Sequence, residues 1–87
     1  MMDAPKTLIV KFRSRNDPTV QSARIRRLVG ADVIEASQLF PGESEEELAS
    51  LFEVVLKSGA AVERALSSLS EDEQIEYAHP PAERGPL

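Results

Sequence analysis

The chain has 87 residues, of which 41% are hydrophobic and 29% are charged, with a formal net charge of −5. This composition is typical of one small globular domain rather than of a disordered segment. With no cysteine and one histidine, the chain offers little for a metal centre or for acid–base catalysis, so we expect no metal, no cofactor and no enzymatic activity. An acidic surface repels phosphates, so we expect no nucleic-acid partner.

The N-terminal stretch MMDAPKTLIVKF lacks a basic region followed by a long apolar core. Its apolar run is interrupted by Lys11 and is too short for a signal peptide or a membrane span. We therefore expect a cytoplasmic protein without membrane association, unless the chain is a piece of a longer precursor.

The first half of the chain predicts a strand, a helix and a second strand. The run at 7–12 alternates, with one set of side chains on each face, and reads as a strand. A helix follows, in which Asp17 is a plausible N-cap, Pro18 stands at the first helical position and Gly30 follows the last turn. The run at 32–40 predicts the second strand.

The second half predicts two more strands around a second long helix. An acidic segment at 41–50 is expected to be a solvated loop or a short helical turn capped by Ser44. The run at 51–57 reads as a strand, Ser58 caps a helix with apolar residues at i, i+3, i+4 and i+7, and 75–78 reads as the last strand.

The order β-α-β-β-α-β predicts an α+β fold, a ferredoxin-like sandwich whose antiparallel four-stranded sheet carries two helices on one face. The two helices cover only one face, yet the strands carry apolar residues on both. In the third strand Phe52, Val54 and Leu56 oppose Leu51 and Val55, and in the second strand Ile34 and Phe40 oppose Val33 and Leu39. An uncovered, partly apolar sheet face indicates a surface for a partner.

Two functions that use the same topology are poorly supported by the residues. An acylphosphatase-like site needs a loop that cradles an anion, and the loop holding Arg13 and Arg15 has no glycine. An RNA-recognition domain stacks bases on sheet aromatics, which are few and lack the motif pattern here. A regulatory, ligand-binding or dimerisation module of the ACT type remains open.

Three stretches together resemble the propeptide/inhibitor I9 family, the prodomains of subtilisin-like serine proteases and their free-standing inhibitor relatives. They are TLIVKFR near the start, LFEVVLKSGAAVERALSSL in the middle and IEYAHP near the end. The order and spacing of the three stretches are more specific than any of them alone, and the resemblance covers nearly the whole chain.

The resemblance implies a function and a division of the chain. Residues 1–78 would form the inhibitor domain, which rests its outer sheet face on the protease, and residues 79–87 would form an extended tail that enters the active-site cleft as a cleavage product does. The resemblance implies cleft contacts for Arg84, Gly85, Pro86 and Leu87, with Leu87 in the primary specificity pocket. It implies contacts with surface helices of the protease for Glu76, Tyr77, His79 and Glu83.

This chain departs from the family pattern at three positions. The family usually carries acidic residues where His79 and Pro81 stand, and a small or apolar residue where Arg84 stands. We expect a stand-alone inhibitor of a separate subtilisin-like serine protease, and an additional folding-chaperone role for that protease is open. An excised prodomain and a ferredoxin-like regulatory or dimerisation module remain alternatives.

Overall fold

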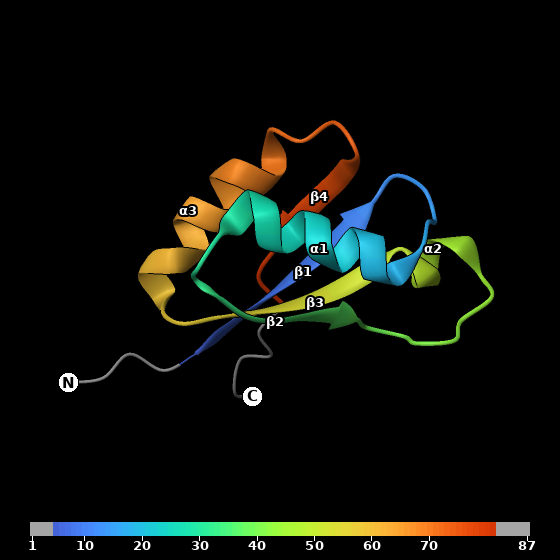
Figure 1. The fold of residues 1–87 in the computed structure, drawn as a ribbon, viewed down its shortest axis with the longest axis horizontal. Helices are drawn as coiled ribbons and strands as arrows, with labels where there is room; N and C mark the ends of the chain where they lie inside the picture. The colour runs from blue at the N-terminus through green and yellow to red at the C-terminus, as the bar shows by residue number, and fades with distance from the viewer. Residues whose placement is uncertain (1–4, 82–87) are drawn as a thin grey trace, which may run out of the picture.

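The computed structural model describes residues 5–81 and shows an α+β fold in which helices lie over one antiparallel sheet (Figure 1). The strands and helices follow the predicted β-α-β-β-α-β order, with one additional short helix before the third strand. In chain order they are β1 (Lys6–Phe12), α1 (Pro18–Val29), β2 (Val33–Gln38), α2 (Glu46–Ala49), β3 (Leu51–Leu56), α3 (Gly59–Ser70) and β4 (Ile75–His79).

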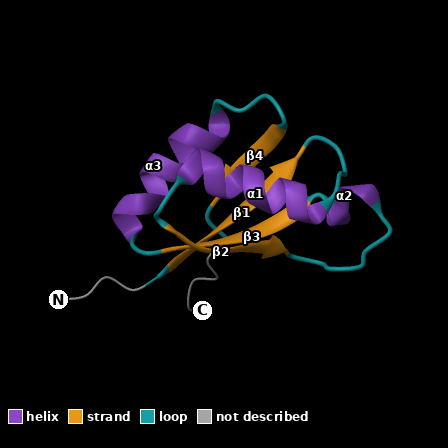
Figure 2. Ribbon diagram, in the orientation of Figure 1, coloured by secondary structure: helices purple, strands orange, loops and turns teal. Residues whose placement is uncertain are grey.

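The sheet has the strand order β2-β3-β1-β4, and every neighbouring pair is antiparallel. The inner strands are therefore β3 and β1, and the edges are β2 and β4. Helices α1 and α3 lie on the same side of this sheet (Figure 2). The arrangement agrees with the predicted α+β fold and is compatible with a ferredoxin-like sandwich.

The ends of α1 are fixed by local chemistry, as predicted. The Asp17 carboxylate accepts a hydrogen bond of 2.8 Å from the backbone N–H of Thr19, and Pro18 occupies the first turn. Gly30 ends the helix with a φ of 89°, a left-handed conformation that favours glycine.

Two predictions about local structure are wrong. The second strand ends at Gln38 rather than at residue 40, because the chain bends into the turn at Gly42, whose φ is 79°. Phe40 therefore lies outside the strand and is 43% exposed. The N-cap of α2 is Glu45 rather than Ser44, and its side chain makes no capping hydrogen bond. Ser58 does occupy the N-cap of α3, but it also caps without a side-chain hydrogen bond.

The hydrophobic core lies between the sheet and the two long helices. Phe12 and Phe52 meet edge to face, with ring centroids 5.3 Å apart. The alternation predicted for β1 and β3 is confirmed, since the residues expected on one face are all buried. The core consists of Leu8, Val10, Phe12, Ile25, Ala36, Phe52, Val54, Leu56, Ala61, Ala65, Leu69 and Ile75.

A charged pair on the helix side connects α1 to the turn before β4. The Arg24 Nε–H is shared between the two oxygens of the Asp72 carboxylate, and Nη2 donates a hydrogen bond of 2.8 Å to the same carboxylate. The Asp72 side chain is only 6% exposed and also accepts from the backbone N–H of Gln74. This pair holds the start of β4 against the helix layer.

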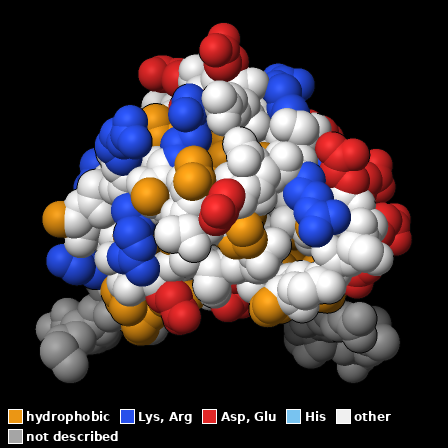
Figure 3. Space-filling view, turned by 45° about the vertical axis from the view of Figure 1, so that its right-hand side comes forward, with side chains coloured by type: hydrophobic (Ala, Val, Ile, Leu, Met, Phe, Trp, Pro, Cys, Tyr) orange, Lys and Arg blue, Asp and Glu red, His pale blue; other side chains and the backbone are white. Residues whose placement is uncertain are grey.

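Charges are unevenly distributed on the helix side of the molecule. Figure 3 shows several Lys and Arg side chains on the left and a cluster of carboxylates at the right edge, with further carboxylates at the top and lower left. Among residues 5–81, no helix combines the length and the apolar character that crossing a membrane requires.

Candidate protein-docking face

The side of the sheet opposite α1 and α3 is covered by no other element among residues 5–81, and we call it the open sheet face. On the inner strands every second residue is buried and the others are partly exposed, so the partly exposed set points to this side. The open sheet face consists of Thr7, Ile9, Lys11, Glu35, Ser37, Leu51, Glu53, Val55, Tyr77 and His79.

Strand register arranges these side chains in rows across the sheet. The longest row runs from His79 on β4 through Ile9 and Glu53 to Ser37 on β2. A second row joins Tyr77, Lys11 and Leu51, so that residues from opposite ends of the chain share one surface.

Three apolar side chains surround the centre of the open sheet face, which Glu53 occupies. Ile9, Leu51 and Val55 lie on the inner strands and remain partly exposed because nothing in the described residues packs over them. Exposed apolar side chains grouped in this way tend to mark a protein interaction site. The predicted two-sided apolar sheet is thus present on β3, whereas Ile34, which is 50% exposed, lies at the irregular start of β2.

A β-bulge sets the side-chain directions on β4. Phe12 pairs with Ile75 and Lys11 pairs with Tyr77, which leaves Glu76 as the extra residue. Ile75 is consequently 3% exposed on the helix side, whereas Tyr77 is 39% exposed on the open side. A regular strand would have placed both on the same side.

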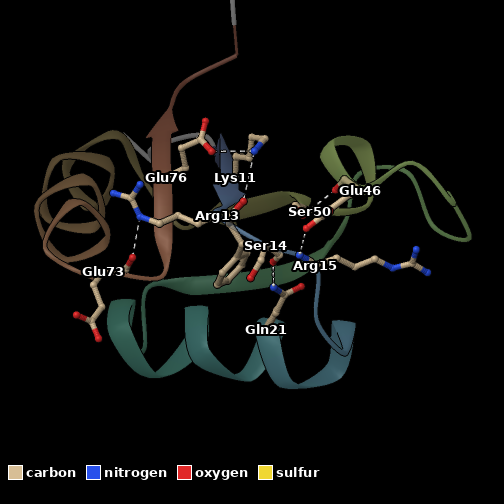
Figure 4. Close-up of polar contacts among 10 residues, drawn as sticks. Lys11, Arg13, Ser14, Arg15, Gln21, Glu46, Ser50, Glu73 and Glu76 are labelled. Atoms are coloured by element: carbon tan, nitrogen blue, oxygen red, sulfur yellow. Dashed lines mark hydrogen bonds and ion pairs between the residues drawn. The ribbon is translucent and has the colours of Figure 1, made fainter.

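The bulge brings together three of the residues that the sequence marked for partner contact. The Glu76 carboxylate lies 3.0 Å from the Lys11 ammonium group, which belongs to the open sheet face (Figure 4). The rings of Tyr77 and His79 stack with centroids 5.1 Å apart. Glu76, Tyr77 and His79 therefore form one polar and aromatic border along the β4 edge.

His79 ends β4, and its exposed ring contacts the backbone of the next residue. Its Nδ1 lies 2.7 Å from the carbonyl oxygen of Pro80, an acceptor, so Nδ1 carries the proton. The other ring nitrogen is left to face solvent or a partner. Prolines 80 and 81 follow, and their restricted φ favours an extended path for the chain.

The other residues predicted to touch a protease lie outside the described residues. These are Glu83, Arg84, Gly85, Pro86 and Leu87. Their contacts with a protease cleft or surface helix stay predictions that follow from the family resemblance.

The two arginines after β1 extend in opposite directions (Figure 4). Arg13 Nε donates to the carbonyl oxygen of Glu73 at 2.8 Å, whereas Arg15 Nη1 donates to that of Ser44 at 3.2 Å. They do not converge on a common anion in the manner of a phosphate-binding loop; each instead fastens a neighbouring loop to the end of β1.

A cavity of about 410 Å³ lies beside this loop and is lined by Phe12, Arg13, Ser14, Asn16, Gln21, Glu73 and Gln74. The Gln21 amide nitrogen donates to the carbonyl oxygen of Ser14 at 3.1 Å, which ties the loop to α1. Within residues 5–81 no group of three or more His, Asp or Glu side chains is placed to hold a metal ion.

No family model matches the chain, and comparison with curated proteins and with solved structures finds no match either. The resemblance to the I9 family therefore rests only on the three sequence stretches TLIVKFR, LFEVVLKSGAAVERALSSL and IEYAHP. The observations that bear on function are the open sheet face and the border along β4.

Proposed function

We propose that this chain inhibits a subtilisin-like serine protease by docking its open sheet face on the enzyme and directing its C-terminal residues into the active-site cleft. The observation that carries the proposal is the partly apolar open sheet face, bordered by Glu76, Tyr77 and His79 on the strand that leads to the C-terminal segment.

Strand position supports this use of the surface. Because β4 is an edge strand, Pro80 and Pro81 leave the sheet at its border. His79 pairs with Ile9, so a partner that covers Ile9 would lie next to the end of β4. An extended segment binds a protease cleft mainly through backbone hydrogen bonds, while alternate side chains enter the pockets.

Inhibition of a panel of subtilisin-like proteases by the purified full chain tests the proposal. We expect competitive inhibition of at least one enzyme, at or below micromolar concentration, measured with a chromogenic peptide substrate. Removal of Pro86 and Leu87 should weaken inhibition by about tenfold or more, because losing the contact of one side chain with its pocket lowers binding affinity by at least that factor.

Two substitutions outside the tail test whether the open sheet face docks on the protease. Tyr77→Ala on the open sheet face should weaken inhibition, whereas Glu63→Gln on the exposed side of α3 should leave it unchanged. If the truncated chain inhibits as strongly as the full chain, the role of the tail is wrong. If the full chain inhibits no protease of the panel, the proposed function is wrong.

Self-association is the competing use of the same apolar surface. A second copy covering Ile9, Leu51 and Val55 would make the chain a stable dimer without any protease. Sedimentation velocity of the full chain distinguishes the two cases, since the proposed inhibitor is expected to sediment as a monomer until the enzyme is added.

A further inference from the structure

Glu53 occupies the middle of the open sheet face. It lies on β3, an inner strand, and strand register places Ile9 on one side of it and Ser37 on the other. Leu51 and Val55 precede and follow it on the same side of the strand. The carboxylate is thus bordered by three partly exposed apolar side chains and one hydroxyl group.

No cation neutralises this carboxylate among residues 5–81, where the ion pairs are Lys11–Glu76, Arg24–Asp72 and Arg64–Asp32. Lys11 is the nearest lysine in the strand register, but its ammonium group is engaged by Glu76 at 3.0 Å. Lys57 lies four positions further along the chain, roughly 13 Å away at the spacing of an extended strand. Glu53 therefore adds a negative charge that the domain itself does not balance.

A partner that covers the apolar residues must also cover Glu53. Removing a carboxylate from water is unfavourable unless the partner supplies a positive charge or hydrogen-bond donors in its place. Glu35 on β2 makes the surroundings more negative still, whereas the charge of Glu76 is balanced by Lys11, so the complementary surface is a positive one.

We infer that the protein bound by the open sheet face presents a lysine or arginine side chain over Glu53, within an apolar rim that contacts Ile9, Leu51 and Val55. This inference rests on the proposed function and deepens it, because it makes Glu53 a residue that determines which subtilisin-like proteases the chain binds. Charge complementarity of this kind sets specificity more than it sets overall affinity.

The test compares Glu53→Gln, Glu53→Ala and the control Glu63→Gln in the inhibition assay. Glutamine keeps the shape and an acceptor oxygen but removes the charge, so Glu53→Gln should weaken inhibition by about tenfold or more. Glu63→Gln removes the same charge from the helix side of the molecule and should change inhibition by no more than about twofold.

Two further measurements complete the test. Thermal unfolding of the free chain should show that Glu53→Gln is as stable as the unsubstituted protein, since the substitution breaks no ion pair. Raising the NaCl concentration should weaken inhibition by the unsubstituted chain more than inhibition by Glu53→Gln, because salt screens the charge pair.

The outcomes separate this inference from the function on which it rests. If Glu53→Gln and the unsubstituted chain inhibit equally, the inference of a cationic group on the partner is wrong, but the proposed inhibitory function is not contradicted. The cationic group is likewise wrong if only Glu53→Ala loses inhibition, because neutral N–H donors would then be sufficient. If the unsubstituted chain fails to inhibit, both proposals fall.

Discussion

The two faces of β3 come from one strand of alternating residues and have different neighbours. Phe52, Val54 and Leu56 are fully buried under the helices, whereas Leu51, Glu53 and Val55 are partly exposed on the open sheet face. The helix side has the edge-to-face aromatic pair and an ion pair whose carboxylate is nearly buried. The open side has apolar residues without a covering layer. The comparison shows that only half of the β3 side chains belong to the core.

The largest expected difference between the two faces is in stability. Phe52→Ala removes a ring that is 0% exposed and lies against Phe12, so the free energy of unfolding should fall by about 3–5 kcal/mol. Val55→Ala on the open side should cost about 1 kcal/mol or less. Urea unfolding followed by circular dichroism measures both, and equal losses would contradict the distinction between the faces.

The ion pair on the helix side should have the next largest effect. Asp72→Asn removes a carboxylate that is 6% exposed, while Arg24 is 32% exposed, so the loss should be about 2 kcal/mol. The matched control is Asp32→Asn, which breaks the more exposed pair with Arg64 and should cost no more than about 0.5 kcal/mol. Similar losses in the two variants would show that burial of Asp72 contributes nothing.

The same ion pair should respond to acid. Hydrogen bonds from Arg24 hold the pKa of Asp72 below its ordinary value of 3.8, against the opposing effect of burial, and the Gln74 N–H and the Arg24 charge lower it further. A carboxylate whose pKa is lowered by folding stabilises the fold above that ordinary value and loses its contribution as the pH falls through the folded pKa. The stability gap between the unsubstituted chain and Asp72→Asn should therefore narrow below about pH 4.

The smallest effect is expected for the ion pair on the open side. Glu76 is 44% exposed, so Glu76→Gln should change the free energy of unfolding by less than about 0.5 kcal/mol, as measured by thermal unfolding. If Glu76→Gln lowered the free energy of unfolding as much as Asp72→Asn does, the Glu76–Lys11 ion pair would have a role in stability and not only in partner binding.

Local sequence patterns predicted the parts of the fold that depend on near neighbours. Alternation in β1 and β3 identified the buried and exposed sides, and Asp17, Pro18 and Gly30 marked the ends of α1. The same two-residue period identified Leu51 and Val55 as residues of the uncovered side.

Features that depend on distant partners could not be read from the sequence. Arg24 and Asp72 are 48 positions apart, and nothing near either residue indicates the other. The grouping of Glu76 with Tyr77 and His79 depends on how β4 pairs with β1. Glu53 was missed as a candidate site residue, although its place between the apolar residues Phe52 and Val54 in a strand was a signal that could have found it.

The bulge in β4 also determines which changes of chain length this strand tolerates. If Glu76 were deleted, Ile75 and Tyr77 would become consecutive residues of a regular strand and would keep their present partners, Phe12 and Lys11. A deletion at Ala78 would instead move His79 from the open side to the helix side. Position 76 therefore behaves as a one-residue insertion, and its carboxylate, which neutralises Lys11, is the one charge on β4 that can be added or removed without reversing the direction of any other side chain.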